Sequence, residues 1–300
     1  MKTYDYVVCD VFTDTRFQGN QLAVVTNAEG LTGEQMQQIA REFNYAESTF
    51  VFEGENDLTK KIRIFTLFRE MPFAGHPNVG TASVLASSGT FGEIEDAASI
   101  IFEQKAGTVE IEVSKNEIGN FFCELKAPED FSLGDQVSLE SLAIALSIKP
   151  TDIITDRHLP QIASVGLPFV FIELKNIEVL KEAKINMDGF DKLHQGGIDP
   201  LIYMYVKTNR GYDIRSRMFA PLAGVYEDPA TGSAGCAVSA LLSHLDASEN
   251  EIYMYKIGQG FEMGRKSLLN SRVKKIGGKI KAVWIGGTSV ITCNGKITIA

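Results

Sequence analysis

The chain begins with a regular succession of hydrophobic patterns. Apolar or alternating runs are typical of strands, and apolar residues three or four positions apart are typical of helices. The patterns predict a strand at 22–25, a helix at 32–43, strands at 48–52 and 61–66, and a helix at 79–86. The last of these consists of small, mostly apolar residues, so we expect it to be buried.

The second part of the chain repeats this order of patterns. They predict a strand at 166–172, a helix at 185–193, strands at 201–206 and 212–219, and a small-residue helix at 234–242. Self-similarity over such a long period indicates an internal duplication.

Two local echoes support the duplication. Arg-Ile-Phe at 63–65 resembles Arg-Met-Phe at 217–219, and the small-residue segment 77–82 resembles 232–237. We therefore favour two related domains over a single unrelated α+β chain.

Further strands follow each small-residue helix, and they are predicted at 99–102, 107–113, 120–125, 252–256, 271–273, 282–285 and 295–299. The polar, proline-containing segment 126–130 is the predicted linker. These assignments give a first domain of residues 1–126 and a second domain of residues 127–289.

Composition restricts the class of partner. The net charge of -9 and the pI near 5.1 argue against nucleic acid or an anionic membrane, because both attract basic surfaces. A small anionic metabolite stays possible, since clustered backbone N–H groups bind anions locally. The N-terminal residues do not resemble a signal peptide, and no apolar run approaches the roughly 18 residues of a membrane span. We therefore expect a cytoplasmic protein.

The starts of the two small-residue helices are candidate anion sites. Gly75-His76-Pro77 begins one, and Thr231-Gly232-Ser233 begins the other, preceded by Asp228-Pro229. A helix N-terminus presents unpaired N–H groups and a partial positive charge. The alternative is that these residues only cap helices, but the occurrence of two such starts favours a function. If a pseudo-two-fold axis relates the domains, both starts face one crevice, where we place the active site.

Three side chains near these starts could transfer protons. Glu47 stands where a helix gives way to an apolar strand, and desolvation there would raise a carboxyl pKa towards the range of a general acid/base. His76 lies at a helix start, which favours a neutral imidazole. Asp228 is the second candidate carboxylate. The alternative roles are a cap or turn residue for Glu47 and an Asx turn for Asp228.

Other catalytic templates are missing from the sequence. There is no dinucleotide-binding GxGxxG before a helix, no phosphate loop and no GxSxG. The four cysteines, Cys9, Cys123, Cys236 and Cys293, form no CxxC pair and are expected to be reduced, mostly core thiols. No His or Cys stands at metal-ligand spacing to His76, and the other histidines, His158, His194 and His244, lie in polar contexts. Carboxylate chemistry is therefore favoured over thiolate or metal chemistry.

The chain resembles the PhzF-like phenazine biosynthesis family. The matching segments occur in the same order over nearly the whole chain, at 12–20, 46–50, 72–77, 227–234 and 259–265. The motifs Gly-His-Pro at 75–77 and Glu-Asp-Pro-Ala-Thr-Gly-Ser-Ala at 227–234 are the most specific. One departure is Gln21, where many members have proline.

The resemblance implies a diaminopimelate epimerase-like α+β fold. In this fold, two pseudo-symmetric domains each form a curled, mostly antiparallel sheet around a central helix. The last strand returns to the first domain, so residues 290–300 would complete it. The resemblance also implies a homodimer that needs no cofactor.

The resemblance assigns a role to each matching residue. Glu47 would be the acid/base that moves a proton between substrate carbons, with His76 and Asp228 assisting. Gly75 would contribute a backbone N–H, and Ser233, with the helix start at Thr231 and Gly232, would bind the substrate carboxylate. The phenazine enzyme of this family isomerises trans-2,3-dihydro-3-hydroxyanthranilate. The epimerase relatives use two cysteines, and the lack of such a pair fits the carboxylate branch.

The functional hypothesis is thus a cofactor-independent isomerase that acts on a small carboxylate-bearing substrate. One alternative is an amino-acid racemase or epimerase of the same fold. Another is a small-molecule binding protein that kept the site and lost the chemistry.

Overall fold

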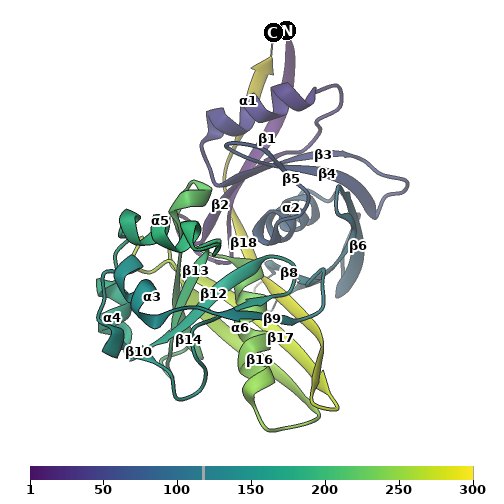
Figure 1. Cartoon of the computed structure of the whole chain (residues 1–300). Helices are drawn as coiled ribbons and strands as arrows, with labels where there is room; N and C mark the ends of the chain where they lie inside the picture. The colour runs from purple at the N-terminus through teal and green to yellow at the C-terminus, as the bar shows by residue number, and fades with distance from the viewer. Residues whose placement is uncertain (117–118, 300) are drawn as a thin grey trace. The chain divides into compact units, whose positions relative to one another are not determined.

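The chain divides into two compact units. Unit 1 comprises Met1–Lys126 and Gly286–Ala300, and unit 2 comprises Ala127–Ile285. The computed structural model describes residues 1–116 and 119–299 (Figure 1).

Unit 1 is a mixed sheet with two helices. Its strands are β1 Lys2–Val11, β2 Asn20–Val25, β3 Glu47–Glu53, β4 Thr59–Thr66, β5 Glu70–Met71, β6 Ala97–Gln104, β7 Gly107–Lys115 and β8 Phe121–Lys126, and its helices are α1 Gly33–Phe43 and α2 Gly75–Ser87. The pairs β2–β3 and β4–β6 are parallel, whereas β3–β4, β6–β7 and β7–β8 are antiparallel. The end of the last strand, β18, pairs antiparallel with β1, so the two termini lie side by side (Figure 1).

Helix α1 packs on one face of this sheet. Thr32 caps its start by accepting a hydrogen bond from Gln35 N–H, and Asn44 ends it in the left-handed conformation. Its apolar stripe, Met36, Ile39 and Ala40, packs in a cluster with strand residues that include Phe50 and Phe65.

Helix α2 is the buried helix that the sequence predicts. Every residue from Gly75 to Ala86 is buried, and strands of unit 1 surround the helix (Figure 1). Gly80 allows a close approach: a Cβ added there would lie 2.6 Å from both Val11 Cγ2 and Leu22 Cδ2. Small residues in α2 therefore let the sheet curl tightly around the helix.

Unit 2 repeats this arrangement with additional helices. Its strands are β9 Ser132–Gln136, β10 Ile153–Ile154, β11 Gln161–Ser164, β12 Pro168–Leu174, β13 Ile202–Lys207, β14 Ile214–Ala220, β15 Val225–Asp228, β16 Glu251–Gln259, β17 Ser267–Ile276 and the first part of β18 Lys279–Ile299. Its helices are α3 Leu139–Ala145, α4 Ile177–Glu182, α5 Met187–Gln195 and α6 Gly232–Leu245, with 3-10 turns at Pro150–Asp152 and Pro221–Ala223. The pairs β12–β13 and β14–β16 are parallel, and β13–β14 and β16–β17 are antiparallel, as in unit 1.

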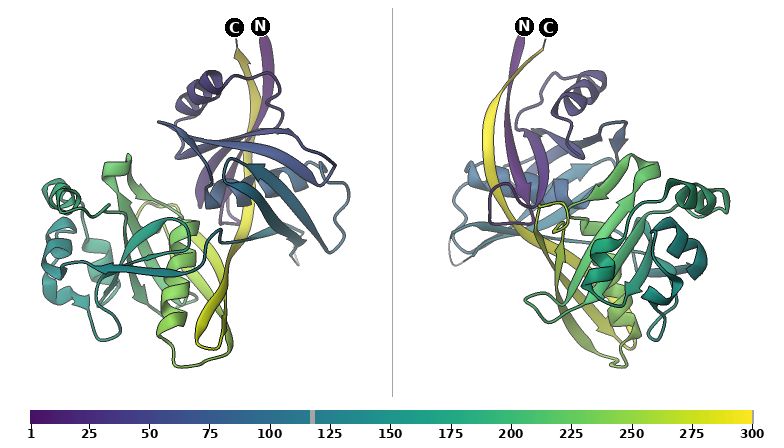
Figure 2. Two further views of the ribbon diagram at one scale, coloured as in Figure 1. Left: turned by 45° about the vertical axis from the view of Figure 1, so that its right-hand side comes forward. Right: turned by 90° about the vertical axis from the view of Figure 1, so that its left-hand side faces the viewer.

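The two faces of the β12–β14 sheet carry different helices. Figure 2 shows α3, α4 and α5 gathered on one face, where Ile172, Met204 and Phe190 belong to a shared core. Helix α6 contacts β11, β12, β16 and β17 and is buried along most of its length. Each unit thus has a central helix (α2 or α6) and a sheet with outer helices.

The two Arg-x-Phe tripeptides have equivalent surroundings. Arg63 of β4 binds Glu70 of β5 through Nε and Nη2, at 2.7 and 2.8 Å. Arg217 of β14 binds Glu227 of β15 in the same bidentate way, at 2.8 and 2.9 Å. Each guanidinium also lies over the phenylalanine two residues later in the chain, at 5.2 and 4.7 Å from the ring centroid. The repeat predicted from the sequence is therefore present in the structure, and each unit has its own copy of the same arginine–glutamate ion pair.

The predicted elements are confirmed with a few corrections. The strands predicted at 282–285 and 295–299 are one continuous strand, β18, which runs through Gly286 and Gly287 without a turn. The helix predicted at 185–193 is α5, which begins two residues later. Helices α3 and α4 and strands β1, β9, β10 and β11 are present without having been predicted. The mixed α+β class and the central helix of each unit are confirmed.

Replacing Gly80 by alanine tests the close approach of α2 to the sheet. The added Cβ would clash with Val11 and Leu22, so we expect the free energy of unfolding to fall by about 1–3 kcal/mol in urea denaturation. Gly33→Ala is the matched control, because the nearest atom to its Cβ is the flexible end of Arg63, at 3.4 Å. Equal stability of the two variants would contradict tight packing at Gly80.

Candidate active site

Glu47 and His76 face each other in unit 1. Glu47 is the first residue of β3, as the sequence predicts, and its side chain is 19% exposed. His76 is the second residue of α2, and its side chain is 7% exposed. His76 Nε2 lies 3.6 Å from Glu47 Oε2, which is close contact but too long for a hydrogen bond.

Burial keeps His76 neutral. Desolvation lowers the pKa of His76 from 6.5 to about 3, while a hydrogen bond with the Gln21 backbone acts in the opposite direction. The pair with Glu47 is therefore not an ion pair at neutral pH. A neutral imidazole has one N–H and one lone pair, so it can donate or accept a proton beside the carboxylate.

The start of β2 supports the imidazole from its other side. Asn20, at 2% exposure, places Nδ2 3.4 Å from His76 Nδ1. Because β2 pairs with β3 and places Leu22 opposite Glu47, the same two strands orient both members of the pair.

The first turn of α2 is held by side-chain amides. Asn78 donates to the Ala74 carbonyl at 2.8 Å, and Gln104, the last residue of β6, donates to Asn78 Oδ1 at 2.6 Å. Ala74 is the N-cap residue, and its own side chain offers no cap. These bonds fix the position of Gly75 and His76 at the helix start.

Asp228 occupies the corresponding place in unit 2. It ends β15, just before α6, and is 8% exposed. The Thr231 hydroxyl donates to Asp228 Oδ2 at 2.6 Å, a short distance typical of a hydrogen bond to a carboxylate. Thr231 is the N-cap residue of α6, but its side chain donates a hydrogen bond to Asp228 and does not cap the helix.

Gln259, the last residue of β16, completes this group. Its side-chain amide donates to the Asp228 carbonyl at 2.8 Å and to Thr231 Oγ1 at 2.9 Å, and it accepts from Thr231 N–H at 3.3 Å. Gly232 and Ser233 follow in the first turn of α6, where backbone N–H groups lack intrahelical acceptors. The predicted carboxylate-binding residues therefore stand at a helix start, the type of position that binds anions.

The structure brings the predicted residues together in two groups. Glu47, His76 and Gly75 belong to unit 1, whereas Asp228, Thr231, Gly232 and Ser233 belong to unit 2. Residues that local patterns did not single out complete the groups, namely Asn20, Asn78 and Gln104 in unit 1 and Gln259 in unit 2. Of these, Asn20 and Gln259 lie inside the segments that resemble the family, and this position is the one feature of the sequence that indicates a role for them.

His158 was also misjudged from its polar neighbours. It is buried, at 7% exposure, and hydrogen-bonds through Nε2 to the Tyr205 hydroxyl at 2.7 Å and through Nδ1 to the Leu159 carbonyl at 2.8 Å. Glu173, paired with Arg157, lies beside Tyr205. This network joins β12, β13 and the preceding loop and serves the packing of unit 2.

The two buried thiols of unit 1, Cys9 and Cys123, are poor nucleophiles. Cys9, Cys123 and Cys236 are buried and reduced, and Cys293 is exposed. Burial raises the pKa of the Cys9 and Cys123 thiols well above their ordinary value, so both stay protonated.

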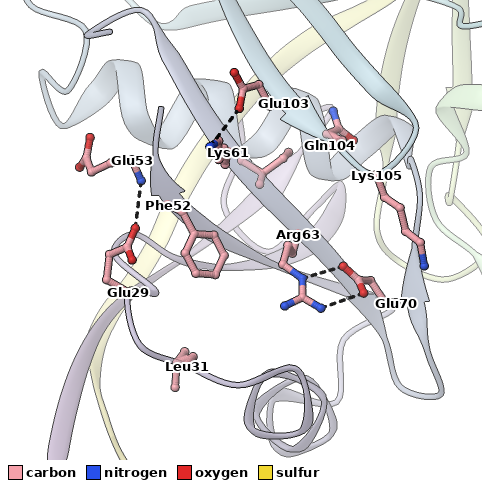
Figure 3. A pocket seen from close by; sticks show the side chains of 11 residues that line it. Glu29, Leu31, Phe52, Glu53, Lys61, Arg63, Glu70, Glu103, Gln104 and Lys105 are labelled. Carbon is pink, nitrogen blue, oxygen red and sulfur yellow. Dashed lines mark hydrogen bonds and ion pairs between the residues drawn. The ribbon is translucent and has the colours of Figure 1, made fainter. Parts of the chain in front are cut away.

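A separate open groove lies on unit 1. It has a volume of about 600 Å³ and runs past Phe52, Arg63 and Lys105 (Figure 3). Its charged side chains are largely paired with one another, Arg63 with Glu70 and Lys61 with Glu103. None of the predicted site residues lines this groove, so it is distinct from the candidate site.

The described part of the chain has neither a membrane-spanning helix nor a cluster of metal ligands. Among residues 1–116 and 119–299, no helix is long and apolar enough to cross a membrane. Over the same part of the chain, no three His, Cys, Asp or Glu side chains are grouped so that they could hold a metal ion.

Comparison with known proteins gives consistent matches over the full length. Residues 9–295 match the family described as phenazine biosynthesis-like protein. An uncharacterised isomerase of Mesorhizobium japonicum is 37% identical, with 100% of both chains covered. The trans-2,3-dihydro-3-hydroxyanthranilate isomerase of Pseudomonas aeruginosa is 33% identical, with 97% of this chain and 98% of the relative covered. A crystal structure of a PhzF-family phenazine biosynthesis protein from Bacillus anthracis aligns with a TM-score of 0.90 at 28% identity over 100% of both chains.

The low pKa of His76 can be tested by nuclear magnetic resonance. In ¹⁵N-histidine spectra we expect the His76 ring to stay neutral down to about pH 4, because its pKa is about 3. Between pH 6.5 and about 3 the unfolded state binds the proton and the folded state does not. The stability due to neutral His76 is therefore complete above pH 6.5 and is lost as the pH falls towards 3. His76→Asn should remove this pH dependence, and a His76 ring that titrates near pH 6.5 would contradict the account.

Proposed function

Because this chain belongs to the phenazine biosynthesis-like family and is an isomerase of that family, we propose that it moves a proton on a small carboxylate-bearing substrate without a cofactor. Glu47 is the acid/base that takes a proton from one substrate carbon and returns it at another. His76 and Asp228 assist the transfer.

The observation that carries this proposal is the contact of Glu47 with a neutral, buried imidazole at 3.6 Å. A general acid/base needs a partly desolvated group that can change its protonation state near neutral pH. Because His76 is neutral, it can accept a proton from Glu47 or donate one to it without carrying a fixed charge. His76, in contact with Glu47, can hold a proton during the reaction or pass it between Glu47 and the substrate.

Substrate binding is assigned to the helix starts. Gly75 at the start of α2, and Thr231, Gly232 and Ser233 at the start of α6, provide N–H and hydroxyl donors for the substrate carboxylate. We propose that both groups of residues act on one substrate, so that one group binds while the other transfers protons. The acidic protein as a whole does not attract anions, so binding depends on these local donors.

We take trans-2,3-dihydro-3-hydroxyanthranilate as the first candidate substrate. It is the substrate named for the Pseudomonas aeruginosa relative, which is 33% identical. This molecule has a carboxylate for the helix starts and a carbon-bound proton to move. The relative that is 37% identical is named only as an isomerase, without a substrate, so other small carboxylic acids should be tested as well.

We also propose a homodimer, by analogy with the family, and a cytoplasmic location. Light scattering coupled to size exclusion should then give twice the 32.9 kDa mass of the chain. A single species at 32.9 kDa at micromolar concentration would contradict the dimer without affecting the proposed chemistry.

Glu47→Gln tests the proposed acid/base. The amide keeps the shape of the carboxylate but cannot take up a proton, so we expect kcat to fall by a factor of about 10²–10⁴. The measurement is turnover of trans-2,3-dihydro-3-hydroxyanthranilate and related acids in D₂O, with deuterium incorporation followed by NMR.

Glu53→Gln is the matched control. Glu53 ends the same strand β3, its side chain is 76% exposed, and it pairs with Lys60. The control should keep the wild-type rate. Undiminished turnover in Glu47→Gln would overturn the assigned role. Inversion at a single carbon would instead identify a racemase or epimerase, and tight binding without any turnover would identify a binding protein.

A further inference from the structure

The polar group at the start of α6 depends on a buried amide that has no assigned role. Gln259 is 0% exposed and contacts both Thr231 and Asp228. We propose that Gln259 is a positioning residue that sets the direction of the Thr231–Asp228 hydrogen bond and so keeps Asp228 an oriented carboxylate. This inference rests on the proposed function of Asp228 and extends it.

Backbone groups fix the orientation of the Gln259 amide. Thr231 N–H can only donate, so the amide atom that it meets at 3.3 Å is the oxygen. The Asp228 carbonyl can only accept, so the amide atom that it meets at 2.8 Å is the nitrogen. The two contacts agree on one orientation, and a flipped amide would lose both bonds.

The remaining N–H of Gln259 then orients the Thr231 hydroxyl. The amide nitrogen donates to Thr231 Oγ1 at 2.9 Å, which makes that oxygen an acceptor. The hydroxyl has a single proton of its own, and Asp228 Oδ2 lies 2.6 Å away. The proton is therefore directed at the carboxylate, where a charge-assisted bond favours the ionised form.

The backbone around Gln259 keeps the amide in place. Gly260 has φ +75°, a conformation that suits glycine. A Cβ on Gly260 would lie 2.3 Å from the Arg265 carbonyl oxygen and 2.6 Å from that of Pro229. The end of β16 can therefore approach the Asp228–Pro229 turn closely only because residue 260 is glycine.

Unit 1 contains the repeat-related counterpart. Gln104 ends β6 as Gln259 ends β16, and each strand pairs in parallel with the strand that carries the arginine of the repeat. Gln104 likewise binds the start of the central helix, through Asn78. Its partner is the Asn78 side-chain amide, which itself donates to the Ala74 carbonyl, whereas the Gln259 group includes a carboxylate. In each unit a glutamine at the end of a strand binds the start of the central helix. In unit 2 this glutamine is also hydrogen-bonded to Asp228 and Thr231.

The direct test is Gln259→Glu, which is nearly isosteric. A glutamate has at most one donor, so it cannot serve both the Asp228 carbonyl and Thr231 Oγ1 in either protonation state. The Thr231 hydroxyl is then free to turn away from Asp228. We expect the protonation midpoint of the Asp228 carboxyl to rise by about one pH unit. Selective ¹³C labelling of aspartate, with Asp228→Asn to assign the signal, measures it.

Further variants separate positioning from added charge and from misfolding. Gln195→Glu adds the same charge at an exposed site of unit 2 and should leave the midpoint unchanged. Thr231→Val removes the hydroxyl donor and should also raise the midpoint of Asp228. Thr231→Ser keeps the hydroxyl and should have the midpoint of the unchanged protein. Thr231→Val adds no charge, so a raised midpoint in that variant cannot come from repulsion between two carboxylates. If Gln259→Glu does not fold, the comparison of Thr231→Val with Thr231→Ser tests whether the Thr231 hydroxyl sets the midpoint of Asp228.

An unchanged midpoint in Gln259→Glu or in Thr231→Val would overturn the inference. The titration needs no substrate, so its outcome is independent of whether a substrate has been found. With an active substrate, the acid limb of kcat against pH should move upward by the same amount in Gln259→Glu, while KM changes less than kcat. A shifted midpoint without a shifted kcat profile would keep the positioning role and reject a catalytic Asp228.

Discussion

A helix buried along most of its length, its start included, leaves the N–H groups of its first turn inside the protein, where they need partners. Both central helices have this problem. At the start of α6, the Gln259 side chain accepts from Thr231 N–H. At the start of α2, Gln104 binds the Asn78 amide, which donates to the Ala74 carbonyl. The first-turn N–H groups of each helix are the donors proposed to bind an anionic substrate.

The same burial sets the protonation states on which the chemistry depends. Desolvation holds His76 neutral beside Glu47, so this pair handles protons without a fixed positive charge. At the other helix start, Asp228 receives the Thr231 hydroxyl at 2.6 Å, which favours the ionised carboxylate. The two units thus contain carboxylates in different environments, an arrangement that agrees with the proposed acid/base roles.

Periodicity and small-residue runs were enough to predict the buried α2 and α6, the repeat and most of the elements that form it, but not elements such as β1, β9–β11, α3 or α4. They also placed Glu47 at a strand start and His76 at a helix start. The double glycine at 286–287 concealed the continuity of β18, because a local pattern does not show pairing along a long strand. Gln259 could not be assigned a role, since its partners lie 28 and 31 residues away in the chain. His158 was missed because its burial comes from Tyr205 on a strand 47 residues away.

The central claim is that the Glu47 and Asp228 groups serve one substrate. A crystal structure of the protein with a non-reactive analogue of a small cyclic amino acid or hydroxy acid tests this most directly. The account predicts one bound molecule whose carboxylate meets a helix start and whose reacting carbon lies within hydrogen-bond range of the Glu47 carboxylate, with Asp228 also in contact. An analogue held by only one of the two groups, with the other remote from it, would contradict the account.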